Sequence, residues 1–170
     1  MTPVAVLALL LAFAAGGRSR LTAQRPGGNA TRLSEAGRRL IQSFEGLSLK
    51  AYPDGAGYSI GYGHYGAQAG DVISPAEAEA LFDRDVARFE DAVAKAAPGA
   101  LQHQFDAMTS LAYNIGAGAF ATSTVAARHR AGDFAGAADA FLAFTKAGGV
   151  DDSRLVARRK RERAIYLGGL

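Results

Sequence analysis

Two carboxylates, Glu45 and Asp54, lie nine residues apart in the stretch FEGLSLKAYPDGAGYSIGYGHYG, which spans residues 44–66. Two carboxyl groups joined by a short segment and a tight turn can face each other across a cleft. One of them can then protonate a leaving oxygen while the other activates water or attacks directly. The hydroxyl of Ser59 follows in the same stretch. These residue types at this spacing are typical of a site that hydrolyses glycosidic bonds.

A short helix is predicted to carry the first carboxylate. Ser34 is a suitable N-cap, and Leu40, Ile41 and Phe44 then share one helical face. This pattern places Glu45 at the C-terminal end of the helix. The helix dipole disfavours an ionised carboxyl there, which suits a general acid. A solvent-exposed glutamate at a helix end is the plainer alternative.

A small β-hairpin or three-stranded sheet is predicted over residues 47–64. The apolar residues Leu47 and Leu49, and the alternating Tyr58, Ile60 and Tyr62, favour strands. The segment Asp54-Gly-Ala-Gly supplies the turn. Aspartate is also a common turn former, so a structural role for Asp54 is compatible with a chemical one. His64 is predicted to be structural and to pair with an acidic neighbour such as Asp71.

The remaining chain reads as helical, which makes the expected fold class α+β. Ser74-Pro75-Ala76-Glu77 is a capping box that opens a long helix, and Pro98-Gly99 ends it. A further helix is expected over residues 102–113, and shorter ones near 124–131, 134–144 and 153–167. The predicted core residues of the two longer helices are Phe82, Val86, Phe89, Val93, Phe105, Met108, Leu111 and Ala112.

The 44–66 stretch resembles phage-type lysozymes of glycoside hydrolase family 24, which carry F-E-G, then L-x-A-Y-x-D, then T-I-G-Y-G-H. Glu45 and Asp54 match the family's Glu-x8-Asp spacing, and Ser59 stands in SIGYGH where the family has Thr. Four residues separate Asp54 from Ser59, whereas many members have five. The resemblance implies a lysozyme-like fold with a small β-hairpin or sheet lobe, a larger helical lobe, a long connecting helix and a cleft between the lobes.

The resemblance also implies roles for individual residues. Glu45 would be the general acid, Asp54 would position or activate water, and Ser59 would assist by hydrogen bonding. The segment AYNIGAGAF with the following ATST is similar to the family's F-N-x-G-x-G-x-F…S-T segment. The implied substrate-binding residues are Tyr113, Asn114 and Ser123, and Tyr65, which follows His64, is predicted to bind substrate at the edge of the cleft. An aromatic face and an amide suit N-acetylated sugars, although Asn114 followed by Gly is also typical of a helix end.

The function that the resemblance implies is an endolysin-like muramidase. Such an enzyme cleaves the β-1,4 bond between N-acetylmuramic acid and N-acetylglucosamine in the glycan strands of bacterial peptidoglycan, and we expect it to act as a monomer without a cofactor. A lytic transglycosylase is an alternative that would use Glu45 alone. The other alternative is a non-catalytic protein of the same fold that binds the cell wall or nucleic acid. The intact carboxylate pair argues against this alternative, and we expect no nucleic-acid partner.

No metal site is predicted. The chain contains no Cys and three His, and those three, His64, His103 and His129, are scattered along the sequence. The absence of Cys also excludes a disulfide scaffold.

Residues 154–163 concentrate the positive charge of the chain. They carry six Lys or Arg and one Glu, whereas the remainder has a net charge of −2. The expected reading is a solvated helix face beside an apolar stripe; attraction to anionic envelope polymers, lipid or nucleic acid is the alternative. Arg158, Arg159 and Glu162 match an R-R-x-x-E run of the family, which suggests a structural or substrate-lobe role. The predicted apolar stripe comprises Leu155, Val156, Ala164, Ile165 and Leu167.

The N-terminal segment has the character of an export signal. Residues 3–15, PVAVLALLLAFAA, are uninterrupted apolar sequence, and about 20 such residues are needed to span a bilayer. Their length fits a signal peptide, and Ala12-Phe13-Ala14 offers a cleavage site; the family resemblance adds the possibility of a signal-anchor that contacts the membrane transiently. We therefore expect a signal or signal-anchor over 1–17, a flexible linker over 18–32, a catalytic domain over 33–170, and export to the periplasm or cell envelope.

Overall fold

The computed structural model of the chain describes residues 30–169. The predicted signal or signal-anchor segment 1–17 lies outside the described residues, as does most of the predicted linker. Within this part of the chain, no helix combines the length and the apolar character that crossing a membrane requires.

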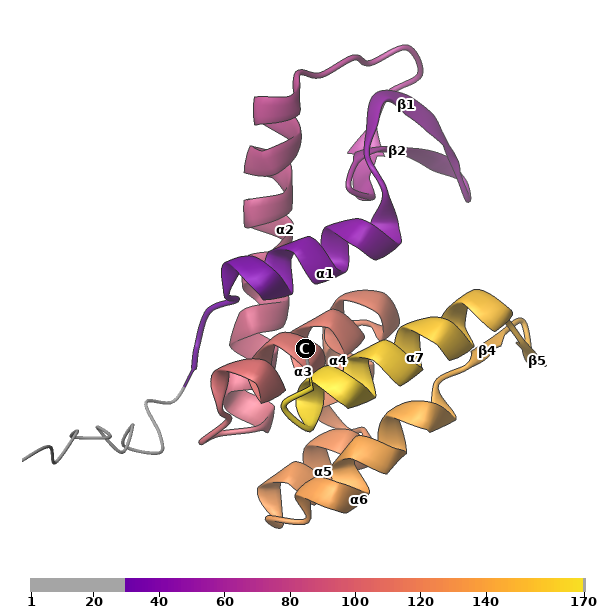
Figure 1. The fold of residues 1–170 in the computed structure, drawn as a ribbon. Coiled ribbons are helices and arrows are strands. Elements are labelled where there is room, and N and C mark those ends of the chain that lie inside the picture. The colour runs from indigo at the N-terminus through magenta and orange to yellow at the C-terminus, as the bar shows by residue number, and fades with distance from the viewer. Residues whose placement is uncertain (1–29, 170) are drawn as a thin grey trace, which may run out of the picture.

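A short helix leads directly into a small sheet (Figure 1). Helix α1 covers Glu35–Glu45, and Ser34 caps it by accepting a hydrogen bond from the Gly37 amide. The strands β1 (Ser48–Asp54), β2 (Gly57–Gly61) and β3 (His64–Ala67) form an antiparallel sheet in the order β1-β2-β3. Asp54 pairs with Gly57, so the β1–β2 turn is made by Gly55 and Ala56, and Gly55 takes a φ of 58°. The turn predicted at Asp54-Gly-Ala-Gly is confirmed.

A long helix connects the sheet to the helical lobe (Figure 1). Helix α2 covers Pro75–Ala96 and begins with the predicted capping box between Ser74 and Glu77. Its four predicted core positions are all buried. The predicted ending at Pro98-Gly99 agrees with the observed last residue to within two positions.

The helical lobe is built around α3, which covers Gln102–Ile115. Nine consecutive residues of this helix, Gln104 to Ala112, are buried, because α1, α2 and α7 pack against different sides of it. The four core residues predicted for this helix are completely buried. The lobe is completed by α4 (Ala117–Ala121), α5 (Thr124–Arg130), α6 (Phe134–Ala140), η2 (Phe141–Ala143) and α7 (Ser153–Tyr166).

Three features differ from the elements expected from the sequence. Helix α4 was not predicted, because its five residues AGAFA follow Gly116, include Gly118 and carry no helical period. The helix expected over 134–144 is divided into α6 and the 3₁₀ turn η2. A small hairpin precedes α7. Its strands, β4 (Lys146–Ala147) and β5 (Val150–Asp151), have two residues each and are too short to give a recognisable sequence pattern.

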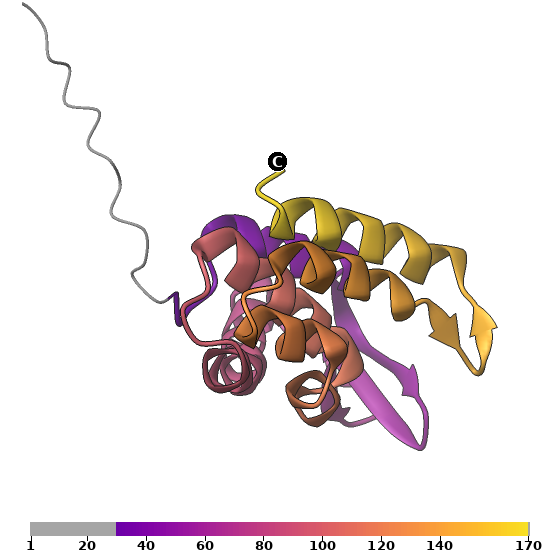
Figure 2. The same ribbon diagram turned by 90° about the horizontal axis from the view of Figure 1, so that it is seen from below.

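Helices α1 and α7 lie side by side across α3, which Figures 1 and 2 show from two directions. Both helices pack on α3. The end of α1 that carries Glu45 therefore lies next to α7, at the side of the molecule where the sheet and the β4–β5 hairpin also lie. This arrangement determines which residues meet around Glu45.

Candidate active site

Glu45 is the last residue of α1, at the junction of helix and sheet. Gly46 ends the helix with a φ of 73°, and its amide donates to the carbonyl of Gln42 over 3.0 Å. The carboxyl of Glu45 is mostly buried, with 23% of its side chain exposed. The predicted placement at the C-terminal end of a helix is confirmed.

Ser59 and Asp54 are joined across the β1–β2 hairpin. The hydroxyl of Ser59 donates to Oδ2 of Asp54 over 2.6 Å. Ser59 is completely buried while Asp54 is exposed at the end of β1. The serine therefore orients one carboxylate oxygen and leaves the other free to face solvent or a bound molecule. The spacing of four residues between Asp54 and Ser59 therefore still allows their side chains to meet.

Tyr52 connects the two carboxylates electrostatically. It lies on β1 opposite Ser59, and its pKa is raised by burial and then by the negative charges of Asp54 and Glu45. The negative charges of both carboxylates therefore act on this one phenol. Tyr52 was not among the site residues predicted from the sequence. Side chains alternate between the two faces of a strand, so Tyr52 and Asp54, two residues apart, share one face. This pattern could have identified Tyr52 from the sequence.

The glycines of SIGYGH allow close approach of the β2–β3 segment. A β-carbon at Gly63 would lie 4.0 Å from Oε2 of Glu45, and one at Gly61 would lie 3.6 Å from the Cα of Ala78 in α2. Both glycines have positive φ, at 87° and 67°. The backbone of this turn therefore passes Glu45 on one side and α2 on the other.

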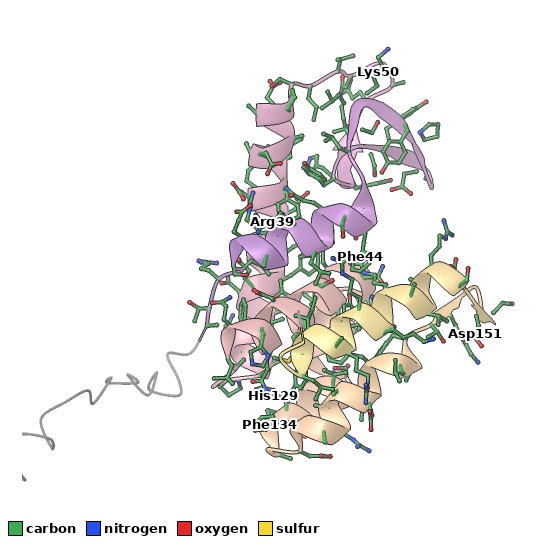
Figure 3. All side chains as sticks on the ribbon, in the orientation of Figure 1. Arg39, Phe44, Lys50, His129, Phe134 and Asp151 are labelled. Carbon is green, nitrogen blue, oxygen red and sulfur yellow. The ribbon has the colours of Figure 1, made fainter. Side chains whose placement is uncertain are left out.

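Arg158 of α7 pairs with Glu45. Its Nη1 donates to Oε1 of Glu45 over 2.8 Å, and its guanidinium lies 4.7 Å from the ring centroid of Phe44. Figure 3 labels Phe44 at the end of α1, facing α7. A guanidinium that is 94% buried holds one oxygen of Glu45, and the other oxygen points toward the β2–β3 turn. The contact joins residues 113 positions apart, so no local pattern could have predicted it.

A buried ionic cluster lies behind Arg158. Oε1 of Glu162 accepts hydrogen bonds from the Ser110 hydroxyl over 2.6 Å, from Nε of Arg158 over 3.1 Å and from Nη2 of Arg159 over 3.0 Å. Burial is the largest effect and raises the pKa of Glu162 above its usual value, although the two arginines and Ser110 act in the opposite direction. Three donors on one oxygen favour the ionised carboxylate.

The cluster corrects the prediction that residues 154–163 form a solvated basic face, for two of the six basic residues; Arg154, Lys160 and Arg161 are exposed as predicted. Arg158, Arg159, Glu162 and Tyr166 form the buried side of α7, while Ala164 and Leu167 of the predicted apolar stripe are exposed. The helical period brings the charged residues together on the side facing α3, where they neutralise one another. This geometry explains the R-R-x-x-E spacing, for which a structural or substrate-lobe role was predicted.

A pocket of about 380 Å³ opens beside Glu45. Asn114, predicted to bind substrate, is exposed and lines this pocket together with Glu45 and Arg158. The β4–β5 hairpin and the start of α7 supply the other wall, through Ala147, Asp152, Arg154 and Leu155. The structure thus brings Asn114 to Glu45 from a different helix.

The other residues predicted to bind substrate have different surroundings. The ring of Tyr113 packs against Phe82 and Phe89, and its hydroxyl donates to the carbonyl of Tyr62 over 3.0 Å. Burial, followed by the charge of Glu45, raises the pKa of Tyr113. The hydroxyl of this residue is therefore engaged within the protein, near Glu45.

Ser123 and Tyr65 do not line the pocket beside Glu45. Ser123 is buried, and its hydroxyl caps α5 by accepting from the Ala126 amide over 3.1 Å. Tyr65 is exposed on β3, opposite Ser59 in the sheet. A β-carbon at Gly57 would lie 2.6 Å from the Tyr65 hydroxyl, so the glycine makes room for this ring.

His64 pairs with an acidic side chain, as predicted, but the partner is Asp85 and the suggested Asp71 is wrong. Nδ1 of His64 lies 2.8 Å from Oδ2 of Asp85 on α2, and Asp71 instead accepts from the Gln68 amide. The turn after β2 directs His64 toward α2, so the pairing residue is distant in sequence. Across residues 30–169, no three His, Asp or Glu side chains are grouped as a metal site would require.

Comparisons with known proteins agree with this geometry. Residues 42–162 match the family described as Phage lysozyme. The chain is 46% identical over 143 residues to the endolysin of Bacillus phage B103, a match that covers 81% of this chain and 54% of that protein. It is 35% identical over 132 residues to the SAR-endolysin of Enterobacteria phage P21, with 74% and 78% covered. The chain thus spans about half the length of the Bacillus phage relative.

The fold is shared with solved structures. The endolysin from Escherichia coli O157:H7 phage FAHEc1 superposes with a TM-score of 0.74 at 39% identity, covering 80% of this chain and 93% of that one. The likeness includes the three-stranded sheet, the long helix and the mainly helical lobe.

Proposed function

Because this chain belongs to the phage lysozyme family, we propose that it is an endolysin-like muramidase. It hydrolyses the β-1,4 bond between N-acetylmuramic acid and N-acetylglucosamine in the glycan strands of bacterial peptidoglycan. The observation that carries this proposal is the geometry of the two carboxylates. Asp54 is oriented by Ser59 over 2.6 Å at the end of β1, and Glu45 ends α1 with its Oε2 4.0 Å from the position of a β-carbon at Gly63, in the turn that follows β2 of the same sheet.

In this mechanism Glu45 is the general acid. It delivers its proton to the glycosidic oxygen as the bond breaks, and Arg158 holds the carboxyl in place. The pair must reorganise when the proton is bound, because a protonated carboxyl interacts with a guanidinium more weakly than a carboxylate does. Glu45 stands at the wall of the pocket that it shares with Asn114, which gives the acid access to a bound sugar.

Asp54 positions or activates the attacking water. Its Oδ2 is occupied by the Ser59 hydroxyl, so Oδ1 is the oxygen available to accept a hydrogen bond from water. Ser59 acts by orienting this carboxylate. An oriented base loses less entropy when the transition state forms than a freely rotating one does.

Asn114, Tyr65, Tyr113 and Ser123 are the proposed substrate-binding residues. Support is strongest for Asn114, whose exposed amide lies at the pocket beside Glu45 and can pair with an acetamido group. For Tyr113 it is the ring that is proposed to contact sugar, since its hydroxyl is engaged by Tyr62. Ser123 would act through the backbone of the α5 start that it caps.

The decisive experiment compares the full chain with its Glu45→Gln variant on a suspension of purified peptidoglycan. Loss of turbidity measures cleavage. Removal of a general acid lowers rates by roughly 10²–10⁴-fold, so the variant should clear the wall at least about 100-fold more slowly. Glu35→Gln, at the other end of α1, is the matched control and should act like the parent. An E45Q variant as active as the parent would refute the assignment of the acid.

Product analysis separates the hydrolase from the two alternatives. A muramidase creates one reducing end for each bond cleaved, whereas a lytic transglycosylase leaves an anhydro end. Accumulation of anhydro ends would replace the muramidase proposal with the transglycosylase. Retention of the chain on the wall without any new end, in parent and control alike, would favour a binding protein.

Export to the cell envelope is proposed for the same chain. Residues 3–15 are uninterrupted apolar sequence, as in a signal or signal-anchor, and the similarity to a SAR-endolysin supports the same role. Peptidoglycan lies outside the cytoplasmic membrane, so an exported chain would reach its substrate. Replacing Leu9 and Leu10 with Asp should keep the chain in the cytoplasmic fraction of expressing bacteria, and release of that variant into the periplasm would contradict the proposal.

A further inference from the structure

Glu45 is the first of four charged groups that form a continuous chain into the protein. Glu45 pairs with Arg158 over 2.8 Å, Arg158 with Glu162 over 3.1 Å, and Glu162 with Arg159 over 2.8 Å. Arg159 and Glu162 are completely buried, and only 6% of the Arg158 side chain is exposed. Three of the four groups are thus shielded from water, which otherwise screens charge.

The charges of the four groups balance when Glu45 is ionised. Two guanidiniums then face two carboxylates, so the cluster is neutral. When Glu45 takes up a proton, as a general acid must, the cluster carries one net positive charge. The stability of the protonated state therefore depends on Glu162, which offsets one of the two arginines.

The contacts also fix the place of Arg158. Glu162 holds Nε of Arg158, the Ser110 carbonyl holds Nη2 over 3.1 Å, and Nη1 is left for Glu45. Arg159 binds the same Glu162 carboxylate from its other side. Glu162 is therefore the residue through which Arg159 influences both the position and the charge balance of Arg158.

We propose that Glu162 and Arg159 are positioning residues for the reaction, acting through Arg158 to hold the Glu45 carboxyl in place and to determine how readily it takes up a proton. Neither residue touches the substrate. The inference rests on the proposed function for the identity of the acid, and it adds a buried charge relay that sets the pH range in which that acid works.

Other groups also face Glu45, and they stay the same in the test. From the sheet these are Tyr52 and Asp54, and from α3 the phenol of Tyr113. The pocket brings the Asp152 and Arg154 side chains of the α7 start near it. Differences between variants that alter only Arg159 or Glu162 therefore report on the relay.

The test compares the pH profiles of Glu162→Gln and Arg159→Met. The alkaline limb of the kcat/KM profile reports loss of the proton from the acid. E162Q keeps the shape of the side chain but removes a negative charge, so its alkaline limb should move to lower pH by about one unit. R159M removes a positive charge, so its limb should move in the opposite direction. The double variant keeps the balance and should return to the parent limb.

Opposite shifts are the result that a merely structural role would not give. Loss of packing alone would lower kcat in both variants and leave both limbs in place, or move them in the same direction; either result overturns the relay. The matched control is Glu90→Gln, which removes another buried carboxylate. Glu90 binds Arg32 and the Leu33 amide near the far end of α1, so the limb of this variant should not move.

A direct titration keeps the relay separate from the proposed function. The ¹³C carboxyl resonance of Glu45 in the full chain should shift with pH, with its midpoint lower in E162Q and higher in R159M. If the midpoints of the parent and the two variants follow this order, yet the parent fails to clear peptidoglycan, the muramidase proposal fails while the relay stands. If the single variants do not fold, the charge-balanced double variant decides: a midpoint that differs from the parent's by a unit or more overturns the relay.

Discussion

The hydrogen bond from the Ser59 hydroxyl to Asp54 shows how one hydroxyl can fix the orientation of a carboxylate. Asp54 is exposed at the end of a strand, where a carboxylate would otherwise rotate freely, and Ser59 is buried beneath it. A hydrogen bond to a charged acceptor is roughly twice as strong as a neutral one. Buried serine therefore provides the stiffness that a β-branched threonine would be expected to bring.

Ser59→Ala should lower the rate of wall clearing by about 10-fold to 100-fold, which corresponds to loss of one hydrogen bond to a charged group. Because Asp54 is exposed, the folded state should lose little stability. Turbidity loss and thermal melting measure the two effects. Ser48→Ala is the control, since the Ser48 hydroxyl donates to the Lys50 carbonyl in the same sheet. Activity within about twofold of the parent in S59A would show that Asp54 needs no such partner.

At the scale of elements, α1 carries Glu45, the proposed acid, and the packing of α1 determines where this residue lies. Gly37 is buried where α1 crosses α3, and a β-carbon there would lie 2.6 Å from Cγ of Asp106. Asp106 cannot move away easily, because it accepts from the Ser34 amide over 2.9 Å and from Gln102 over 2.9 Å. Glycine in mid-helix lowers helix propensity, and here the close crossing accounts for it.

Gly37→Ala should destabilise the protein by about 1–3 kcal/mol through overpacking, although alanine gains up to about 1 kcal/mol in helix propensity. The net effect should be a lower melting temperature. Ala36→Ser changes the exposed neighbour in the same turn and should leave melting unchanged. A higher melting temperature for G37A would mean that α1 can shift without loss, and would weaken the claim that this crossing positions Glu45.

At the scale of the whole molecule, two polar contacts tie the helical lobe to the segment that runs from the end of α1 through the sheet. One is the pair between Arg158 and Glu45, and the other is the hydrogen bond from Tyr113 to the Tyr62 carbonyl. Each joins segments more than 50 positions apart. The relative position of the two lobes therefore depends on a small number of polar contacts around an aromatic cluster.

Tyr113→Phe should keep the aromatic packing and remove the hydrogen bond between the lobes. We expect a loss of about 1 kcal/mol, which for a protein of this size lowers the melting temperature by roughly 2–4 °C. Differential scanning calorimetry measures it, with Tyr58→Phe on β2 as the control. Because the ring remains, KM for peptidoglycan fragments should stay within about threefold. A large rise in KM would indicate that the hydroxyl itself contacts sugar.

His129 makes the stability of the helical lobe depend on pH. It is buried, its Nδ1 lies 2.7 Å from the Tyr166 hydroxyl, and burial lowers its pKa. Figure 3 labels it beside Phe134, at the lower end of the lobe. In the unfolded chain a histidine takes up a proton at about pH 6.5. Stability is therefore fully present above that pH and is lost as the pH falls toward the lowered folded value, by at most about 1.4 kcal/mol per pH unit.

His129→Gln should flatten the dependence of melting temperature on pH between about pH 7 and pH 5, even if its melting temperature is lower throughout. His103→Gln serves as the control; His103 is only partly buried and should leave the slope unchanged. Equal slopes in H129Q and the parent would assign the acid sensitivity to other groups.

Local patterns were sufficient to predict most of the fold and to propose the centre of the site. The capping box at Ser74, the apolar period of α2 and the turn after Asp54 depend on neighbours a few positions away, and all three predictions are confirmed. The segment that holds Glu45, Asp54 and Ser59 is likewise continuous, so its residue types and spacing were enough to propose a chemistry.

Tertiary structure alone decided which distant residues complete the site. The partner of His64 is Asp85 and that of Glu45 is Arg158, and neither could be read from spacing, because each depends on how two elements pack. The six basic residues of 154–163 have the composition of a solvated surface. Only the packing of α7 on α3 turns two of them inward, since a charge can be buried when an opposite charge from the same helix turn lies beside it.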